Sequence, residues 1–366
     1  MKYDFIVVGA GFYGCTFARA VAEKGARVLV IEKNGYIGGL SHTYFIDKVQ
    51  VHSYGPHILH TDSDRVWTFL KHFGTVNNFK YHPIACYKDK YYSFPVNKMT
   101  LQQANITPPL KGQTCENENF EEYLIRRMGK KIYTMFFYYY TKKMWGVEPR
   151  TLPASIAHRI PFRPATLNDQ YYTHKYEGIA QDGYTKLMEN MLDHKNIKIY
   201  YNDNFLENRW HYKKIAKNII FTGTIDSYFN YEFGMLPYRT LDINYVGNKK
   251  WYYAVDALGA NAVNYTDNRE CTREICHNYW LPETINNCDK YVITTETPRS
   301  LTSPFDEGIP MYPMRNIGNS VEIYEKYRNL AKHLSNVHFK GRLGDYKYMD
   351  MCPTIEDALH FAEEFT

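Results

Sequence analysis

The sequence lacks any run of about 20 apolar residues, the length that a membrane-spanning helix requires, so no membrane insertion is expected. Its first four residues lead directly into a strand pattern, without the apolar core and cleavage site of a signal peptide. Its seven cysteines form no CxxC pair, which argues against both a zinc site and a disulfide framework. These absences together predict a cytoplasmic protein that has reduced thiols and binds no metal.

The sequence also lacks a large excess of positive or negative charge, since the formal net charge is only +5 and the Lys and Arg residues are dispersed. Nucleic-acid binding needs a clustered basic stripe, so this function class is excluded. The chain has 366 residues, enough for two or three domains, and its 44% hydrophobic and 23% charged content is that of a globular protein. It also contains 35 tyrosines, some of which we expect to line a site.

A glycine motif stands between a strand pattern and a helix pattern near the N-terminus. Residues 5–8 are apolar, Gly9, Gly11 and Gly14 follow as GxGxxG, and an amphipathic pattern runs on to Gly25. The first glycine permits a tight turn, the second lets a pyrophosphate approach the backbone, and the third lets helix and strand pack closely. Because the helix N-terminus adds free N–H groups, the motif predicts a dinucleotide site.

A second strand pattern, residues 27–31, ends on Glu32, about 20 residues after Gly11. An acid at this place binds the ribose hydroxyls of an adenine dinucleotide and disfavours a 2′-phosphate, so NADP is not expected. FAD is favoured over NAD by the glycine pair at residues 38–39 and by a strand end at residues 341–342 that leads into a C-terminal helix. The N-terminus of such a helix suits the electron-rich end of a flavin.

The remaining pattern predicts an α/β protein whose Rossmann-like FAD-binding domain is discontinuous, with two lobes inserted into it. Apolar spacing between residues 120 and 145 is helical, with Gly129 between two helices, whereas residues 239–300 alternate as strands do. Shorter patterns predict helices at 62–73 and 354–364, a hairpin around 87–92, and strands at 197–200, 219–223 and 337–340.

Further stretches carry a more specific signal, because they follow one another in order along nearly the whole chain. They are HSYGPHILHT (52–61), YTKKMWG (140–146), RIPFR (159–163), YEGI (176–179), GYTKL (183–187), FTGTID (221–226), NYTD (264–267), YP (312–313) and GRLGDYKYMD (341–350). With these stretches and the glycine turn, the chain resembles the bacterial-type UDP-galactopyranose mutase family.

The resemblance implies an enzyme, an isomerase that interconverts the pyranose and furanose forms of a nucleotide sugar, UDP-galactose foremost, in polysaccharide biosynthesis. Family members use reduced FAD as a nucleophile toward the anomeric carbon, without net redox change. The resemblance also implies a homodimer with three parts. These are a FAD-binding domain (1–78, 185–238 and 311–366), a helical lobe (98–150) and an antiparallel β-sheet substrate lobe (79–97, 151–184 and 239–310).

The resemblance also assigns residues to the cofactor. Those matched to FAD binding are Gly9, Gly11, Gly14, Glu32, Lys33, Gly39, Leu40, Arg342, Asp350 and Met351. Leu40 departs from the family, which usually has Asn there, and it cannot make the hydrogen bonds of an amide.

The diphosphate of the substrate is a free anion midway through the reaction, so its charge must be balanced. The resemblance assigns this role to Arg163 and Arg273, whose planar guanidinium groups suit phosphate oxygens, and Arg269 is a competitor for the second position. Tyr176, Tyr312 and Tyr348 match the rest of the cradle and would donate hydrogen bonds without adding charge.

Other matches concern the sugar, the base and the flavin. Phe136, Tyr140, Trp145, Asn264 and Glu296 match substrate contacts, and aromatic faces suit a base. The stretch around residues 144–146 is expected to end its helix as a mobile lid. His57 and His60 match a pair beside the flavin, where histidine can stabilise charge or move a proton.

Two alternative functions are compatible with the same FAD-binding domain. One is a FAD-dependent oxidoreductase of the amine-oxidase type, although an amine substrate would favour an aromatic cage with fewer cations. The other is a catalytically inactive FAD- or nucleotide-sugar-binding protein, which the departure at Leu40 makes conceivable.

Overall fold

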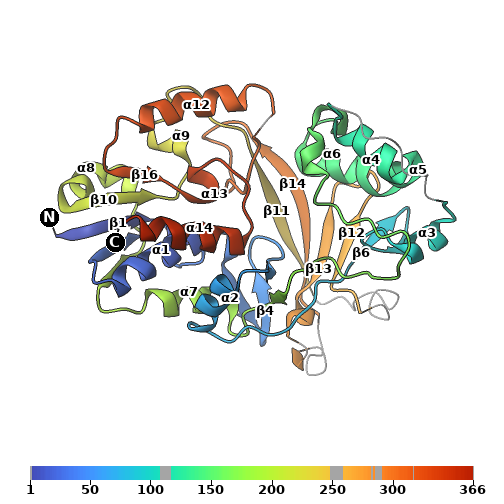
Figure 1. Ribbon diagram of the computed structural model, residues 1–366, viewed down its shortest axis with the longest axis horizontal. Helices are drawn as coiled ribbons and strands as arrows, with labels where there is room; N and C mark the ends of the chain where they lie inside the picture. Colours follow the sequence, from blue (N-terminus) through green and yellow to red (C-terminus); the bar gives the residue numbers. More distant parts are fainter. Residues whose placement is uncertain are drawn as a thin grey trace.

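The computed structural model describes residues 2–107, 117–247, 259–281, 283–284, 291–315 and 317–365, which include every residue assigned above to a site. Two β-sheets lie side by side in Figure 1, with a parallel sheet and its helices at the left and a larger sheet in the centre. The helical lobe lies at the right-hand end. The expected α/β class, a Rossmann-like domain with a helical and a β lobe, is confirmed.

The parallel sheet has five strands in the order β16-β10-β1-β2-β9. These are β1 (Tyr3–Val8), β2 (Val28–Ile31), β9 (Ile197–Tyr200), β10 (Ala216–Phe221) and β16 (Val337–Phe339). The central strand β1 runs parallel to β2 on one side and to β10 on the other. Val and Ile dominate β1 and β2 and are buried on both faces, which is the pattern of a parallel sheet that helices cover on both sides.

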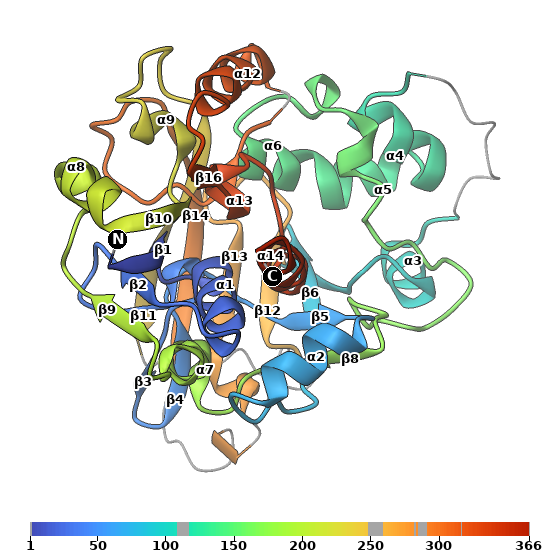
Figure 2. The same ribbon diagram turned by 60° about the vertical axis from the view of Figure 1, so that its left-hand side comes forward.

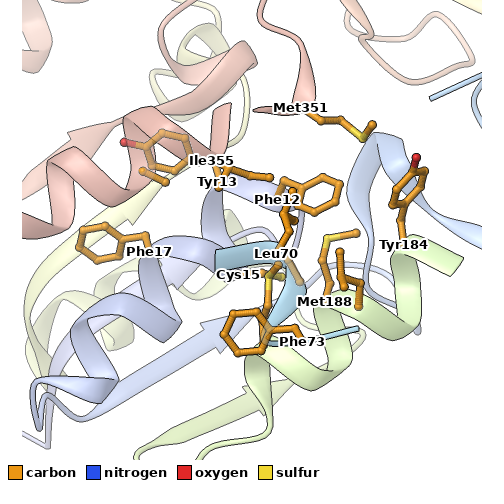
Figure 3. Close-up of a cluster of buried hydrophobic side chains, with 14 of the residues drawn as sticks. Phe12, Tyr13, Cys15, Phe17, Leu70, Phe73, Tyr184, Met188, Met351 and Ile355 are labelled. Atoms are coloured by element: carbon orange, nitrogen blue, oxygen red, sulfur yellow. The ribbon is translucent and has the colours of Figure 1, made fainter. Parts of the chain in front are cut away.

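Helices cover the two faces of this sheet. On one face, α1 (Phe12–Glu23) packs against α7 (Gly183–Leu192) and α14 (Met351–Glu363). Figure 3 shows side chains that fill this layer, among them Phe12, Cys15, Phe17, Leu70, Phe73, Tyr184, Met188 and Ile355. On the opposite face, residues of α8 (Phe205–Ile215) pack against Ile6 and Leu29 of the sheet.

The larger sheet has seven strands in the order β15-β11-β14-β13-β12-β6-β7. These are β6 (Pro83–Tyr87), β7 (Lys90–Ser93), β11 (Tyr238–Gly247), β12 (Ala262–Tyr265), β13 (Arg273–Cys276), β14 (Ile293–Leu301) and β15 (Tyr312–Pro313). Neighbouring strands are antiparallel as expected, except that β12 and β6 run parallel. A parallel pair requires a long connection, which here includes the whole helical lobe.

The helical lobe contains α3 (Lys98–Ala104), α4 (Phe120–Met128), α5 (Lys130–Ile132), the π-helical segment η2 (Tyr133–Tyr138) and α6 (Tyr139–Trp145). Asn97 and Asn119 begin α3 and α4 with capping boxes. Gly129 has a φ of 90° and separates α4 from α5, as the sequence predicted. The π-helical turn places η2 and α6 beside the central sheet, and such turns are frequent at functional sites.

Shorter elements complete the fold. They are η1 (Gly39–Ser41), β3 (Thr43–Ile46), β4 (Val49–His52), β5 (Leu59–Thr61), α2 (Asp64–Lys71), η3 (Pro149–Thr151), η4 (Ala154–Ile156), β8 (Tyr176–Gly178), α9 (Ile225–Tyr228), η5 (His277–Trp280), α12 (Ser320–Ala331) and α13 (Gly341–Gly344). The expected helices at 62–73 and 354–364 are α2 and α14. Figure 2 shows α2, β5 and β8 close together below α14.

The division into three parts stays a prediction. Its helical range 98–150 and β range 239–310 include residues 108–116, 248–258, 282 and 285–290, which lie outside the described residues. None of the described helices is both long and apolar enough to cross a membrane. Five cysteines belong to the described residues, and all of these except Cys271 are buried.

Candidate functional site

A cavity of about 1180 Å³ lies where the two sheets and the helical lobe meet. One wall comes from residues 54–63 and 342–356, beside the parallel sheet, and another from residues 120–163 of the helical lobe and its exit. Strands of the larger sheet supply Asn264, Arg273 and Tyr312. Parts of the chain that are far apart in sequence therefore build one partly open cavity of the size that a ligand site needs.

The glycine turn fits a pyrophosphate. Gly9 has a φ of 99°, and a Cβ on Gly14 would lie 2.0 Å from the carbonyl oxygen of Gly9, so no larger residue fits there. A Cβ on Gly39 would lie 3.0 Å from the Cα of Gly11, which shows how closely the second glycine turn approaches the first. The N-terminus of α1 has no side-chain cap and no acid in its first turn, so its N–H groups are free for an anion.

Glu32 has a structural role that the motif did not predict. Its side chain is 4% exposed, and its two carboxylate oxygens accept hydrogen bonds from the backbone N–H groups of Ala10 and Asn34, both at 2.9 Å. It therefore holds the glycine turn in shape. A carboxylate has about four acceptor positions, so two remain for ribose hydroxyls. The turn, its glycines and this acid together fit the adenosine diphosphate half of FAD.

The other predicted cofactor residues fall into two groups. Leu40 lies half-buried in η1 next to the glycine turn, and Lys33 is exposed at the end of β2. Arg342, Asp350 and Met351 line the cavity. The side chain of Asp350, at the N-cap of α14, makes no capping hydrogen bond, so the N-terminus of this helix faces the cavity with free N–H groups, as the sequence predicted for the flavin end.

His57 and His60 both line the cavity. Burial lowers the pKa of His57 to about 4, although its ring nitrogen Nδ1 lies 2.8 Å from the carbonyl oxygen of Gly55. Burial also lowers the pKa of His60 to about 4. The negative charge of Asp350, whose carboxylate is 3.9 Å away, acts in the other direction and raises this pKa, but its effect is smaller. Both imidazoles are therefore neutral at physiological pH, and each can donate one hydrogen bond and accept another.

Arg273 is held by three side chains around the cavity. Its guanidinium donates hydrogen bonds to the hydroxyl of Tyr140 at 2.8 Å and to the side chain of Asn264 at 3.1 Å. The carboxylate of Glu296, which is 1% exposed, lies 3.7 Å away. The competitor Arg269 instead binds Asp267 outside the cavity lining, at 2.7 Å.

Arg163 and Tyr176 are placed less centrally. Arg163 lines the cavity, but it donates to the backbone carbonyls of Asn168 and Gln170 in its own loop. Tyr176 does not line the cavity, because its ring stacks on Trp67 at 5.0 Å and its hydroxyl donates to a carboxylate on α2. Its assignment to the phosphate cradle stays a prediction. In this structure it is the neighbouring residue of β8, Glu177, that is buried, and neighbouring strand residues face opposite sides.

The remaining predicted substrate residues Phe136, Tyr140, Trp145, Tyr312 and Tyr348 all line the cavity. The mobile lid expected at residues 144–146 stays a prediction, and in this structure hydrogen bonds hold the backbone at the start of the segment. The buried guanidinium of Arg239 donates to the backbone carbonyls of Met144 and Lys143, which end α6. The ammonium of Lys143 in turn donates to the carbonyl oxygen of Tyr265 at 2.8 Å.

Sequence reasoning missed several residues of the cavity wall, and three of them are notable. Arg159, Tyr171 and Tyr172 line it, and Tyr172 stacks on His60 with ring centroids 3.8 Å apart. Arg159 could have been found, because it belongs to the same matched stretch as Arg163. No group of three potential metal ligands occurs among the described parts of the chain.

Comparison with known proteins agrees with this geometry. Residues 135–348 match the family described as UDP-galactopyranose mutase, and residues 7–73 match an NAD(P)-binding Rossmann-like domain. The chain is 35% identical to a probable UDP-galactopyranose mutase of Klebsiella pneumoniae, over 99% of this chain and 94% of that protein. It is 36% identical to a dTDP-fucopyranose mutase of Escherichia coli, over 98% of this chain and 97% of that protein. A crystal structure of reduced UDP-galactopyranose mutase shares the fold, with a TM-score of 0.74 at 12% identity, over 99% of this chain and 95% of that one.

Proposed function

Because the chain belongs to the UDP-galactopyranose mutase family, we propose that it interconverts the pyranose and furanose forms of a nucleotide-linked hexose, with UDP-galactose as substrate. The observation that carries the proposal is the convergence of Arg273, Tyr140 and Tyr348 on one cavity that the N-terminus of α14 also faces. An anionic leaving group and a flavin ring would meet in this space.

The cofactor that the site fits is FAD, held at its phosphates by the glycine turn and α1 and at its far end by the residues around the start of α14. When bound in its reduced form, FAD supplies a nucleophilic nitrogen toward the anomeric carbon of the sugar. The chain itself must bind the nucleotide, balance the charge of the detached diphosphate and keep water away.

Several residues suit these tasks. Arg273 can hold the diphosphate, because Tyr140, Asn264 and Glu296 already fix the direction of its guanidinium. The hydroxyl groups of Tyr312 and Tyr348 supply neutral donors, so the anion is bound without being over-stabilised. Neutral His57 and His60 can accept a proton from a sugar hydroxyl or return one as the ring opens and closes.

The test is to load the protein with FAD, reduce it with dithionite, and incubate it with UDP-galactopyranose or UDP-galactofuranose while chromatography follows both sugars. We expect interconversion only in the reduced state and no net use of reductant. Conversion that consumes reductant or oxygen in proportion to product would instead indicate a FAD-dependent oxidoreductase and would contradict the proposal.

A second candidate substrate is dTDP-fucopyranose, favoured by the similarity to the Escherichia coli enzyme of that name. Parallel incubations with dTDP-fucose and UDP-galactose, compared through kcat/KM, decide between the two sugars. We further propose that the protein is a cytoplasmic homodimer that acts in polysaccharide biosynthesis. Light scattering on the purified flavoprotein tests the dimer, since a monomer mass would contradict it.

A further inference from the structure

Basic side chains gather at the left-hand end of the molecule in Figure 1, where α8 covers one face of the parallel sheet. Two segments build this surface, residues 2–8 and 197–221, and they contain six basic and three acidic residues. We call the surface the α8 face, and it consists of Trp210 and the six basic residues Lys2, Lys198, Arg209, Lys213, Lys214 and Lys217. The pairing of β1 with β2 and β10, and of β2 with β9, brings the two segments together.

Hydrogen bonds and ring contacts fix where the outer members of this face lie. The backbone N–H of Lys2 donates to the carbonyl oxygen that ends α8, at 2.9 Å. Lys217 starts β10 and pairs with Asp4 of β1 at 2.8 Å. On β9, the ammonium of Lys198 lies 5.1 Å from the ring centroid of Tyr200, which packs against the core beneath α8. The α8 face therefore extends from β9 across the start of β1 to β10, as Figure 2 also shows.

An exposed tryptophan stands among these cations. Trp210 is 68% exposed, whereas Tyr212 of the same helix is buried in the core and anchors α8 to the sheet. The guanidinium carbon of Arg209 and the ammonium nitrogen of Lys213 lie 5.6 and 5.4 Å from a ring centroid of Trp210. Lys214 follows four residues after the tryptophan and therefore lies on the same side of the helix.

The acidic residues of the two segments leave this face positive. Asp4 forms an ion pair with Lys217, but within the described residues no other of the six basic side chains lies at ion-pair distance from a carboxylate. The carboxylate of Asp203 accepts a hydrogen bond from a tyrosine of α8, and that of Glu207 accepts one from Asn204. Six positive and three negative charges give a formal charge of +3.

Cations around an exposed tryptophan are complementary to the surface of an anionic lipid bilayer. Negatively charged headgroups attract Lys and Arg, and the headgroup region suits the apolar ring and the polar N–H of Trp. A single-stranded nucleic acid would instead need a positively charged groove and several aromatic platforms, whereas here one aromatic side chain stands on the outside of a helix. No residue of the α8 face lines the cavity, so a docked protein keeps its cavity accessible.

We propose that the α8 face docks the protein reversibly on an anionic lipid bilayer, with Trp210 among the headgroups and the surrounding cations against their negative charges. The bilayer is bound at its surface and is not crossed. The inference goes beyond the proposed function and does not depend on it, because it concerns a surface outside the cavity.

Co-sedimentation of the FAD-loaded protein with lipid vesicles tests the inference. The vesicles contain phosphatidylcholine alone or phosphatidylcholine mixed with phosphatidylglycerol, each at low and at high NaCl concentration. The variants are Trp210→Gln and the double variant Lys213→Gln/Lys214→Gln. The double variant Lys71→Gln/Lys186→Gln is the matched control, because it removes the same charge from exposed lysines of α2 and α7, which pack on the opposite face of the sheet. The visible spectrum of each variant reports its FAD content.

We expect the wild type to bind the mixed vesicles but not phosphatidylcholine alone, and to bind less at high salt. The partition constant should fall about 10- to 30-fold in Lys213→Gln/Lys214→Gln and about 10-fold in Trp210→Gln. FAD content should not change, and the control should match the wild type.

Three results would overturn the inference. The first is that the wild type does not bind the mixed vesicles more tightly than phosphatidylcholine alone. The second is an equal loss of binding in the Lys71→Gln/Lys186→Gln control, since that would indicate a general effect of net charge. The third is displacement of the protein from the vesicles by a single-stranded oligonucleotide that carries the same total charge as the anionic lipid, since nucleic acid would then be the preferred partner.

Discussion

The stability of the folded protein should fall on mild acidification because of two buried histidines beneath the cavity. His277 is fully buried, and its Nδ1 accepts hydrogen bonds from the indole N–H of Trp280 at 3.0 Å and from the backbone N–H of His52. Its Nε2 therefore carries the proton and donates to Thr294 at 2.9 Å. A second proton on this ring would have to displace both donors.

The sign of the effect follows from the direction of the pKa shifts. Burial lowers the pKa of His277 to about 3 and that of His52 well below its usual value. Below about pH 6.5 the unfolded chain therefore binds protons at these histidines that the folded chain does not bind. As the pH decreases, the free energy of unfolding decreases with it. On acidification from pH 8 to pH 5, each histidine that stays neutral in the folded state lowers the free energy of unfolding by about 2 kcal/mol, so the pair lowers it by about 4 kcal/mol.

Urea unfolding of the FAD-loaded protein at several pH values between 8 and 5, followed by tryptophan fluorescence, measures this dependence. The variant His277→Gln keeps a donor and an acceptor but cannot be protonated. We expect it to be less stable than the wild type at pH 8 but to lose about 2 kcal/mol less on acidification. His211→Gln, on the exposed side of α8, should follow the wild-type curve. Parallel curves for the wild type and His277→Gln would refute the reasoning.

Three further predictions concern the site and its support. Gly14→Ala should give a protein without bound FAD, seen as a loss of yellow absorbance, because the added Cβ would lie 2.0 Å from the carbonyl oxygen of Gly9. Arg273→Ala should lower kcat of the mutase reaction about 10²- to 10³-fold with FAD content unchanged, and an unaltered kcat would remove it from the diphosphate site. Arg239→Met should lower the free energy of unfolding by about 2–4 kcal/mol and raise KM, because it leaves the carbonyls at the end of α6 without donors. A loss of stability without a change in KM would show that this end of α6 does not position the substrate.

Local spacing explains why the adenosine diphosphate end of the FAD site could be predicted from sequence. The contacts between Gly9 and Gly14 and between the glycine turn and the acid at the end of β2 lie within one short βαβ unit. The spacing of these residues can therefore be recognised in the sequence. The helices and strands with clear periodicity were likewise found near their observed bounds. Parallel pairing between β12 and β6 could not be read in this way, because it depends on how the helical lobe returns the chain to the sheet.

The substrate end was less predictable for the same reason. Arg159, Tyr171 and Tyr172 belong to an irregular segment whose side chains have no periodic pattern, and only the path of the chain across the cavity brings them to Tyr348 and His60. The matched stretches named Arg163 and Tyr176. In the structure Arg163 binds carbonyl groups of its own irregular loop, and a long-range contact turns Tyr176 toward α2.

The interleaved order of the strands also determines when the site can come into being during synthesis. The glycine turn leaves the ribosome first, but β1 keeps one edge open until β10 has been made, and β6 waits in the same way for β12. The cavity gains its last wall only with Arg342 and the start of α14. A nascent chain therefore presents unpaired strand edges for most of its synthesis, and such exposed edges make a chain prone to aggregation. The complete cavity exists only after α14 has been made.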